Sequence, residues 1–332
     1  MIQPLRACSL LTATWLLLLV PPTVASPAEE MIETTPGAVV RALEAAILLS
    51  GQEGGDIRLA VWQGVFARAD ELQIVLIVEV DGPAALVGVT DRPLDLDLFL
   101  YALDPGEQVV RSISRRVHIE SSQHRDRFAR SGLRFPVYLS LPNQSHVLRL
   151  LVRTGEEAFG IRSLTIEETP DARSPTRFNP PAFASLADEW LVALPLAGSA
   201  TIPSTGVPFL APESSRLPAA LPVWRRGDTP RASLFLPPET HLANSIEAVL
   251  RPEFADTVIR WAVDVTAIEH SEDLQLDIVQ IELPEVDLAS GVYTAILDLQ
   301  SNEDTVGKTR PFNFVVADGD EALPWPHLDW HP

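Results

Sequence analysis

Two stretches of this sequence decide its fold, because they follow the same pattern. Residues 135–168 read FPVYLSLPNQSHVLRLLVRTGEEAFGIRSLTIEE, and residues 277–316 read DIVQIELPEVDLASGVYTAILDLQSNEDTVGKTRPFNFVV. Each contains a strand ending in Leu-Pro, a short turn, an apolar strand, a polar turn and a final strand. The Leu-Pro pairs begin at Leu141 and Leu283, about 140 positions apart, a spacing typical of a duplicated domain rather than of a solenoid repeat.

Alternating apolar residues extend this pattern upstream of both stretches. Residues 72–80 and 94–101 are apolar at every second position, and Asp95 and Asp97 are expected on the wet side of their strand. A later strand is expected to place on one face Ile259, Trp261, Val263, Val265 and Ala267. Frequent turns, such as the Asp-Gly at 81–82, favour an antiparallel arrangement. We predict a mainly β chain with two tandem antiparallel immunoglobulin-like β-sandwich domains preceded by one short helix.

The one predicted helix lies ahead of the first domain. Thr35 suits the N-cap position, Pro36 suits the first helical position, and Gly51 ends the pattern. The apolar stripe of the helix consists of Val39, Val40, Leu43, Ala46 and Ile47. We expect this stripe to pack on the first sandwich.

The predicted organisation follows from these patterns and from the distribution of proline. It is a signal peptide at 1–25, an N-terminal segment at 26–56 with the helix at 35–50, a first sandwich at 57–169, a proline-rich connector at 170–222, a second sandwich at 223–317 and a C-terminal tail at 318–332. Within the connector, residues 190–194 either add an edge strand or pack across a domain.

The N-terminus has the layout of a secretory signal peptide. Arg6 supplies the positive charge, residues 10–20 are apolar, and the small residues Thr23 and Ala25 fit a cleavage site after Ala25. The alternative, an uncleaved anchor, needs about 20 apolar residues, and this run is shorter. We expect an exported protein (periplasmic, cell-surface or secreted) with no transmembrane segment after signal cleavage.

Composition and missing motifs exclude several function classes. The only cysteine is Cys8, so a mature chain has no thiolate for catalysis, zinc or iron–sulfur clusters. The formal net charge is −20, which repels nucleic acid and anionic lipid. Nucleophilic hydrolysis has no Gly-x-Ser-x-Gly motif, and the Gly-Ser at 198–199 and the Ser-Thr-Gly at 204–206 lie in the connector.

Candidate metal sites each have a plainer interpretation. His118 and His124 flank an arginine-rich segment that we interpret as a strand end and a solvated loop, which suits an anionic partner better than a dication. The tail carries His327, Asp329 and His331 at alternate positions, a pattern that could ligate zinc or copper, although ligands on a terminal segment bind weakly. Asp95 and Asp97 could suggest calcium, but paired carboxylates are more often the wet side of a strand. We predict no catalytic, cofactor-binding or metal-binding residues and no cofactor.

Tryptophans raise the alternative of a sugar-binding platform, which needs exposed aromatic faces. Those within the domains are Trp62, Trp224 and Trp261, and both Trp62 and Trp261 alternate with apolar neighbours, which favours the core. In the tail, Trp325 and Trp330 either fold back on the second domain or engage a partner.

Residues 41–168, and more loosely 217–316, resemble the region that follows the von Willebrand factor A domain in the VWFA-related acidobacterial proteins. The resemblance is carried by RALEAAILL, IRLAVWQGVF, LDLFLYALDPGEQVV, SGLRFPVYLSLP, LPVWRRGDTPRASLFLP and LASGVYTAILDLQ. It implies an exported, envelope-associated β-rich protein. Residues 26–56 are too short for an A domain, and no Asp-x-Ser-x-Ser metal site is present, so metal-dependent adhesion does not carry over.

Together these patterns predict a non-catalytic exported protein that mediates protein–protein contacts in the periplasm or at the cell surface, with a protein partner in the cell envelope. A carbohydrate-binding module is the first alternative and a hydrolase the second. An exposed apolar patch or a long unpaired strand edge would favour a protein partner. Clustered exposed aromatics would favour sugar, and a buried histidine–carboxylate–hydroxyl group in a cleft would favour an enzyme.

Overall fold

The computed structural model describes residues 30–36, 42–68, 70–87, 93–155, 158–167, 177–184, 190–194, 208–209, 217–238, 240, 245–301 and 304–318. In these residues the chain is mainly β, with many strands in several sheets and a few helices. The predicted fold class is confirmed at that level. The predicted signal peptide and all but the first residue of the predicted tail lie outside the described residues.

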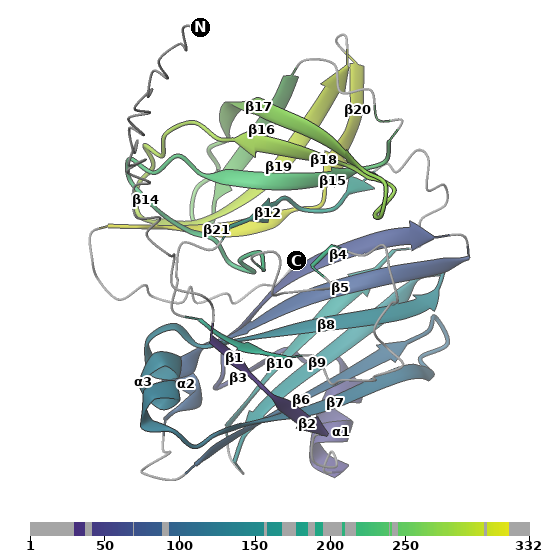
Figure 1. The fold of residues 1–332 in the computed structure, drawn as a ribbon, viewed down its shortest axis with the longest axis vertical. Helices are drawn as coiled ribbons and strands as arrows, with labels where there is room; N and C mark the ends of the chain where they lie inside the picture. Colours follow the sequence, from purple (N-terminus) through teal and green to yellow (C-terminus); the bar gives the residue numbers. More distant parts are fainter. Residues whose placement is uncertain are drawn as a thin grey trace, which may run out of the picture.

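Two sheets pack face to face in the part of the chain that we call the N-terminal unit (Figure 1). The first has the order β1 (Glu30–Ile32), β13 (Leu191–Ala193), β8 (Leu133–Pro142), β5 (Glu71–Val80) and β4 (Leu59–Arg68). The second has the order β2 (Thr34–Pro36), β7 (Val109–Ile119), β6 (Leu94–Leu103), β9 (His146–Thr154), β10 (Ala158–Ile166) and β3 (Gly54–Gly55). Strand β13 pairs in parallel with β8, so the connector does add a strand to this sheet, although not at its edge as predicted, because β1 pairs with the other side of β13.

The core of the N-terminal unit lies between these sheets. Alternate residues of β5, such as Leu72 and Leu76, and of β6, such as Leu96 and Leu100, belong to one buried cluster. The predicted inward faces of both strands are therefore confirmed.

The remaining strands form the C-terminal unit, whose main path is β11-β20-β19-β16-β17-β18-β15-β12, with β21 pairing both β19 and β14. The bounds are β11 (Arg177–Phe178), β12 (Ala182–Phe183), β14 (Val223–Arg225), β15 (Arg231–Leu236), β16 (Ser245–Pro252), β17 (Ile259–Ser271), β18 (Leu276–Glu282), β19 (Gly291–Ser301), β20 (Asp304–Thr309) and β21 (Phe312–Ala317). Its core includes Tyr293, Leu297 and Phe314.

Strand neighbours correspond between the two units. Strand β8 lies beside β5 as β18 lies beside β15. Strand β9 lies between β6 and β10 as β19 lies between β16 and the pair β20 and β21. The two stretches with the shared sequence pattern therefore occupy equivalent places. Strands β7 and β17 are counterparts too, because each follows and pairs with the preceding strand, β6 or β16.

The outer face of the β4–β5–β8 layer is covered by the C-terminal unit and the connector (Figure 1). Val75 and Ile77 of β5 belong to a buried cluster that includes Phe235 of β15. In addition, Trp62 Nε1 donates to Pro181 O at 3.2 Å. Strand β5 is consequently buried on both faces.

Helix α1 (Ala42–Ser50) begins later than predicted. Thr35 and Pro36 are not its first residues but belong to β2, which pairs antiparallel with β7. Pairing with β7 fixes these residues as extended backbone, so the capping signal at Thr35 is overridden by a sheet contact.

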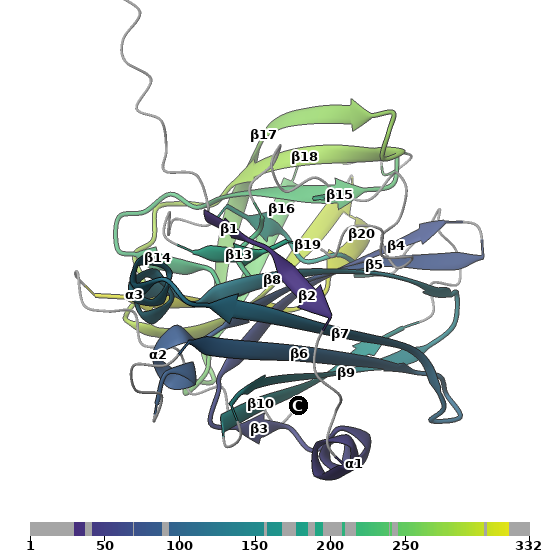
Figure 2. The ribbon, with the colours of Figure 1, turned by 60° about the horizontal axis from the view of Figure 1, so that its bottom comes forward.

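The buried face of α1 also differs from the predicted stripe. Glu44 and Leu48 are buried, whereas Ala46 is exposed. Arg149 Nη1 donates to Leu48 O at 2.9 Å, which satisfies a carbonyl at the end of the helix. Figure 2 shows α1 lying below β9 and β10. Of the predicted stripe, Val39, Val40 and the side chain of Leu43 lie outside the described residues.

Two further helices correct the prediction of a single one. Helix α2 (Gly82–Ala85) is capped by the Asp81 side chain, and helix α3 (Ser122–Ser131) is capped by Ser121, whose Oγ accepts from His124 N at 3.0 Å. The helices touch so closely that a Cβ on Gly82 would lie 1.7 Å from Phe128 O. No helix among the described residues is long and apolar enough to cross a membrane.

Candidate functional site

Strand β17 crosses from one half of the C-terminal unit to the other. Its residues 259–263 pair with β16, whereas residues 264–271 pair with β18 alone. The opposite edge of residues 264–271 has no strand beside it in the part of the chain that the structure describes. Figure 2 shows β17 outermost, with β18 and then β15 behind it. The backbone groups on this edge are therefore open to pairing with another strand.

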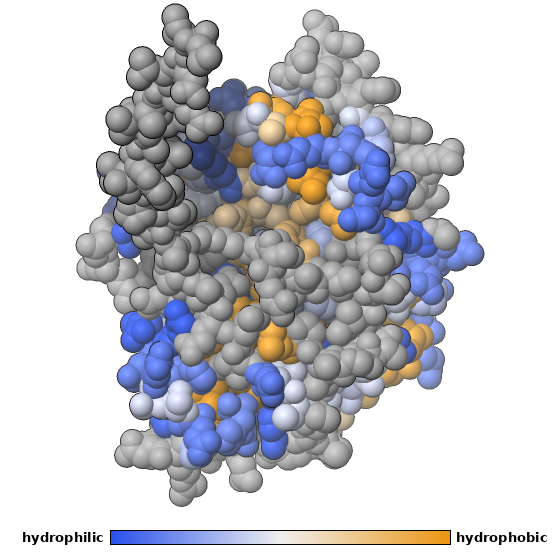
Figure 3. Space-filling view, viewed as in Figure 1, coloured by the Kyte–Doolittle hydropathy of each residue, from blue (hydrophilic) through white to orange (hydrophobic). Residues whose placement is uncertain are grey.

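The open edge carries exposed apolar side chains. Val265 is 41% exposed and Ile268 is 56% exposed. Val265 is directly opposite Ile281 and Ile268 is directly opposite Val279, and opposed side chains lie on the same face of a sheet. Because Ile281 and Val279 belong to the core, Val265 and Ile268 face the open margin of that core. Figure 3 shows hydrophobic side chains at the surface in the region of β17, beside hydrophilic ones.

A β-bulge at Thr266 changes which residues face the core. The register shifts between Val265 and Ala267, and Thr266 Oγ1 donates to Gln280 O at 3.2 Å. The predicted alternation, with Ala267 on the inner face, is therefore wrong beyond Val265, and Ile268 takes that place. One inserted residue is enough to exchange the two faces of a strand.

The counterpart of β17 in the N-terminal unit has its edge covered. Strand β2 pairs with β7, with Thr34 opposite Val117 and Pro36 opposite Arg115. Thr34 Oγ1 also donates to Leu194 O at 2.7 Å, which ties the segment to the connector. An extended segment therefore adds to β7 on the side away from β6, and the side of β17 away from β16 is taken by β18.

His118 and His124, weighed above as a candidate metal site, lie on different elements. His118 Nδ1 lies 2.6 Å from Asp95 Oδ1 on the outer face of its sheet, while His124 lies on helix α3, where a loop was predicted. A second pair joins His270 Nδ1 to Asp277 Oδ1 at 2.9 Å. Neither His118 nor His270 hydrogen-bonds a hydroxyl group among the described residues, so neither pair resembles the base of a hydrolytic triad.

The prediction that Asp97 lies on a wet strand face is wrong. Asp97 is buried and accepts from Arg116 Nη2 at 2.8 Å and from Arg153 Nη2 at 2.9 Å. Arg153 also pairs with Glu44 of α1 at 2.6 Å. Burial lowers the pKa of Arg153, but the bonds to Glu44 and Asp97 outweigh it and the pKa is raised. Helix α1 therefore covers a face that the sequence shows only as polar.

The tryptophans within the units do not form a platform. Trp62 and Trp224 are buried, and Trp261 is half-buried against the core of the C-terminal unit. Phe254, in the turn between β16 and β17, is 92% exposed and stands without another strongly exposed aromatic in the described residues. A single ring does not make a stacking surface.

The tail residues singled out above lie outside the described residues; they are Trp325, His327, Asp329, Trp330 and His331. Within the described ranges, no group of three or more histidine, cysteine, aspartate and glutamate side chains could hold a metal ion.

The free edge of β17 is a feature that alternation alone did not reveal. Its signal in the sequence is Ile268, an apolar residue in a polar run, whose side chain is exposed in the structure.

Comparisons with known proteins add no family. No protein-family model and no curated protein matches the chain. Among solved structures, a purple acid phosphatase from yellow lupin (Lupinus luteus) seeds is 11% identical, with 89% of this chain and 41% of that chain covered and a TM-score of 0.26. The chain thus spans less than half of that enzyme.

Two other solved structures show weaker likenesses. The collagen adhesin of S. aureus is 7% identical over 81% of this chain and 93% of that chain, with a TM-score of 0.14. The Bacillus anthracis TIE protein is 7% identical over 80% of this chain and 40% of that chain, with a TM-score of 0.13. Likenesses at this level support no conclusion about activity.

Proposed function

We propose that this chain is a non-catalytic binding protein that contacts another protein by adding one extended segment of that partner to the free edge of β17. One observation carries the proposal: among the residues that the structure describes, one edge of residues 264–271 has no strand beside it, and Val265 and Ile268 remain exposed there. In strand addition, backbone hydrogen bonds supply affinity and alternate side chains supply specificity. The partner segment would place apolar side chains over Val265 and Ile268.

The energy available at this edge suits a reversible contact. Full burial of a valine or isoleucine side chain stabilises by roughly 1.5–3 kcal/mol. Since Val265 and Ile268 are already about half buried, covering both would add roughly 1.5–3 kcal/mol in total to the backbone hydrogen bonds. The cover that β2 gives to β7 supports this mode of binding, because the counterpart strand already accepts an extended segment.

The proposal includes the predicted setting of the protein. We infer export to the periplasm, the cell surface or the medium, with a partner in the cell envelope. We also interpret residues 57–169 and 223–317 as two immunoglobulin-like sandwiches joined by the connector, which the corresponding strand neighbours support. The sugar-binding and hydrolase alternatives have no observation in their favour among the described residues.

The test is to identify the partner and then to locate its contact. The protein would be used to capture binding proteins from its own envelope fraction, and the purified partner would then be studied by hydrogen–deuterium exchange. We expect slower exchange of the amides of residues 264–271, and loss of binding in Ile268→Lys, because a lysine there blocks an edge and opposes apolar contact.

Val109→Lys is the matched control. Val109 is 47% exposed and lies at the start of β7 in the other unit. Binding that survives Ile268→Lys, or protection confined to other strands, would contradict the proposal. Sedimentation of the protein alone shows whether it self-associates, which distinguishes a second copy of this chain from a different partner.

A further inference from the structure

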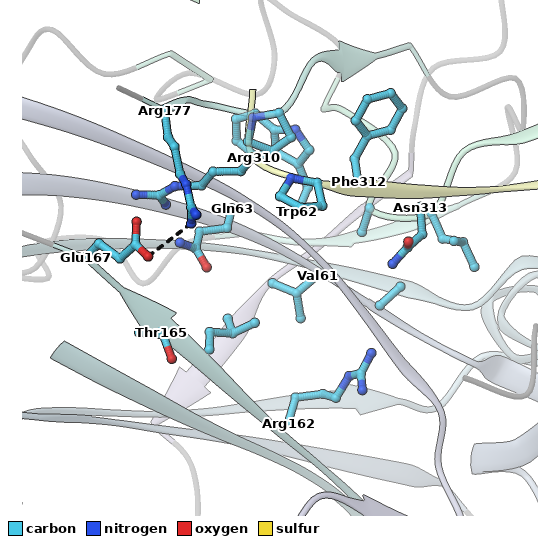
Figure 4. A pocket seen from close by; sticks show the side chains of 16 residues that line it. Val61, Trp62, Gln63, Arg162, Thr165, Glu167, Arg177, Arg310, Phe312 and Asn313 are labelled. Atoms are coloured by element: carbon cyan, nitrogen blue, oxygen red, sulfur yellow. Dashed lines mark hydrogen bonds and ion pairs between the residues drawn. The ribbon is translucent and has the colours of Figure 1, made fainter. Parts of the chain in front are cut away.

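A cavity of about 270 Å³ lies between the two units, away from β17 (Figure 4). Its described walls come from β4 and β10 of the N-terminal unit, from the connector, and from the junction of β20 and β21. Its lining includes these polar side chains: Gln63, Arg162, Thr165, Glu167, Arg177, Arg310 and Asn313. Apolar groups, among them Val61, Leu164, Leu221 and Phe312, line the rest.

The charge of this lining is opposite to that of the protein. The chain has 45 acidic and 25 basic residues, yet three arginines and one glutamate line the cavity. Arg177 pairs with Glu167 at 3.2 Å, and Arg162 pairs with Glu53, outside the lining, at 3.4 Å. These two ion pairs leave one guanidinium, that of Arg310, without a carboxylate partner in the described residues.

Arg310 has a hydrogen-bonded backbone and a buried guanidinium nitrogen without a partner among the described residues. Its backbone N–H donates to Phe178 O at 2.8 Å, and its Nη1 is buried without a hydrogen-bond partner among the described residues. Burial lowers the pKa of Arg310, the Glu167 carboxylate raises it, and the neighbouring Arg177 lowers it. Figure 4 shows the guanidinium groups of Arg310 and Arg177 near Glu167 and Gln63, with Arg162 apart from them. A buried donor of this kind costs free energy unless it is paired.

From this geometry we propose that the cavity is a binding site for a small organic monocarboxylate, whose carboxylate pairs with Arg310 and whose apolar body rests on the Val61, Leu164 and Phe312 side. One unpaired guanidinium matches one negative charge, and the fork of an arginine matches the two oxygens of a carboxylate. A dianion such as phosphate is less suited, since the Glu167 carboxylate lies beside Arg310 and would repel the second charge.

Size and position limit the ligand further. Typical ligand cavities measure about 300–1,000 Å³, so this one accepts only a small molecule. Because its walls come from both units, a bound ligand contacts both and is expected to stabilise their packing. This site is independent of the β17 edge and of the partner proposed there.

Titration calorimetry with three probes tests the assignment on the whole protein. The probes are benzoate, its neutral isostere benzamide, and inorganic phosphate. We expect saturable binding of benzoate, binding of benzamide at least about tenfold weaker because its amide lacks the charge that pairs with Arg310, and phosphate weaker than benzoate. Benzoate should also raise the melting temperature, as any ligand of the folded state does.

Three variants locate the binding. Arg310→Gln should lower the affinity for benzoate at least about tenfold and leave the affinity for benzamide unchanged. Arg310→Lys keeps the charge but not the forked guanidinium, so its affinity for benzoate should lie between those of Arg310→Gln and the parent. Arg231→Gln, in an exposed strand pair with Glu282, is the matched control and should bind as the parent does. Melting curves of all three establish that the variants fold.

Several outcomes would overturn the proposal. They are equal affinity for benzoate and benzamide, no saturable binding of benzoate, tighter binding of phosphate, or a folded Arg310→Gln that binds benzoate like the parent. If Arg310→Gln fails to fold, the Arg310→Lys variant and the benzamide comparison still decide the matter.

Discussion

The ion pair between Arg134 and Glu79 gives the sharpest test of how the two units are joined. These residues lie directly opposite each other on β8 and β5, and each is only 1% exposed. Both Nε and Nη2 of Arg134 lie 2.8 Å from Glu79 Oε1, and Glu79 Oε2 accepts from Leu221 N at 3.2 Å. Trp190 lies against the guanidinium at 4.6 Å. The pair is therefore sealed between the N-terminal unit and the connector.

The expected energies follow from this burial. Arg134→Met leaves Glu79 as an uncompensated buried charge, which costs about 3–5 kcal/mol of the free energy of unfolding. The double variant Arg134→Met with Glu79→Met removes both charges and leaves the Leu221 N–H unpaired, at a cost of about 1–3 kcal/mol that apolar packing partly offsets. The double variant should therefore be more stable than Arg134→Met alone, with a coupling energy of about 2 kcal/mol or more.

Urea unfolding followed by circular dichroism measures each free energy, and a double-mutant cycle gives the coupling. The exposed pair of Arg231 and Glu282 is the control, since such surface pairs contribute only about 0–1 kcal/mol. If the coupling at Arg134 and Glu79 equals that of the control, water reaches the pair in solution. The connector would then not close over β5 and β8, and the reasoning would fail.

Three further predictions concern the folding of the units. Leu48→Ala should lower the free energy of unfolding by about 2–3 kcal/mol and Leu49→Ala by less than about 0.5 kcal/mol, because Leu48 is 0% and Leu49 is 48% exposed. Equal losses in urea unfolding would mean that α1 is not docked. Gly82→Ala should lower the melting temperature by several degrees, because the Cβ of the alanine would lie 1.7 Å from a carbonyl oxygen of α3. An unchanged melting curve would contradict this contact between the two helices. Burial lowers the pKa of Arg115 to about 10, so its charge opposes folding below that pH. The free energy of unfolding of Arg115→Met should therefore be about 1 kcal/mol higher than that of the parent at pH 7, and the difference should shrink as pH rises through 10. A constant difference from pH 7 to 11 would refute this.

Much of the core was predictable because alternation reports directly on burial. The inward faces of β5, β6 and β19 follow from period-two patterns, and the structure confirms them. The outward faces were not predictable in the same way. Asp97 and Glu79 lie at outward positions of their strands. The sequence pattern is the same whether water, a helix or another unit covers a charged residue at such a position. In β5 the apolar Val75 and Ile77 at the outward positions were the available signal that both faces are buried.

Local signals failed where a distant contact outweighed them. Thr35 and Pro36 have the residue types of a helix start, yet pairing with β7 makes them strand, and that partner lies far along the chain. The reverse holds for α3: Ser121 and Gly132 have the residue types of a helix start and a helix end, and the prediction of a loop there is wrong. Helix ends are thus readable only when no strand edge competes for the same backbone.

The corresponding strand neighbours of the two units explain why the two proposed sites differ in how visible they are from the sequence. Strand β7 pairs with β6 along its length and with β2 on its other side, whereas β17 leaves β16 after Val263 and pairs with β18 from Asp264 onward. The exposed Ile268, in a polar run of the sequence, is the signal of this difference. The cavity has no corresponding signal in the sequence. Val61, Leu164 and Arg310 are remote in sequence and meet only because the units pack together, and Arg310 becomes exceptional only once the nearby arginines are seen to be paired. A site made by packing two copies against each other belongs to neither copy, so no motif within one copy could have marked it.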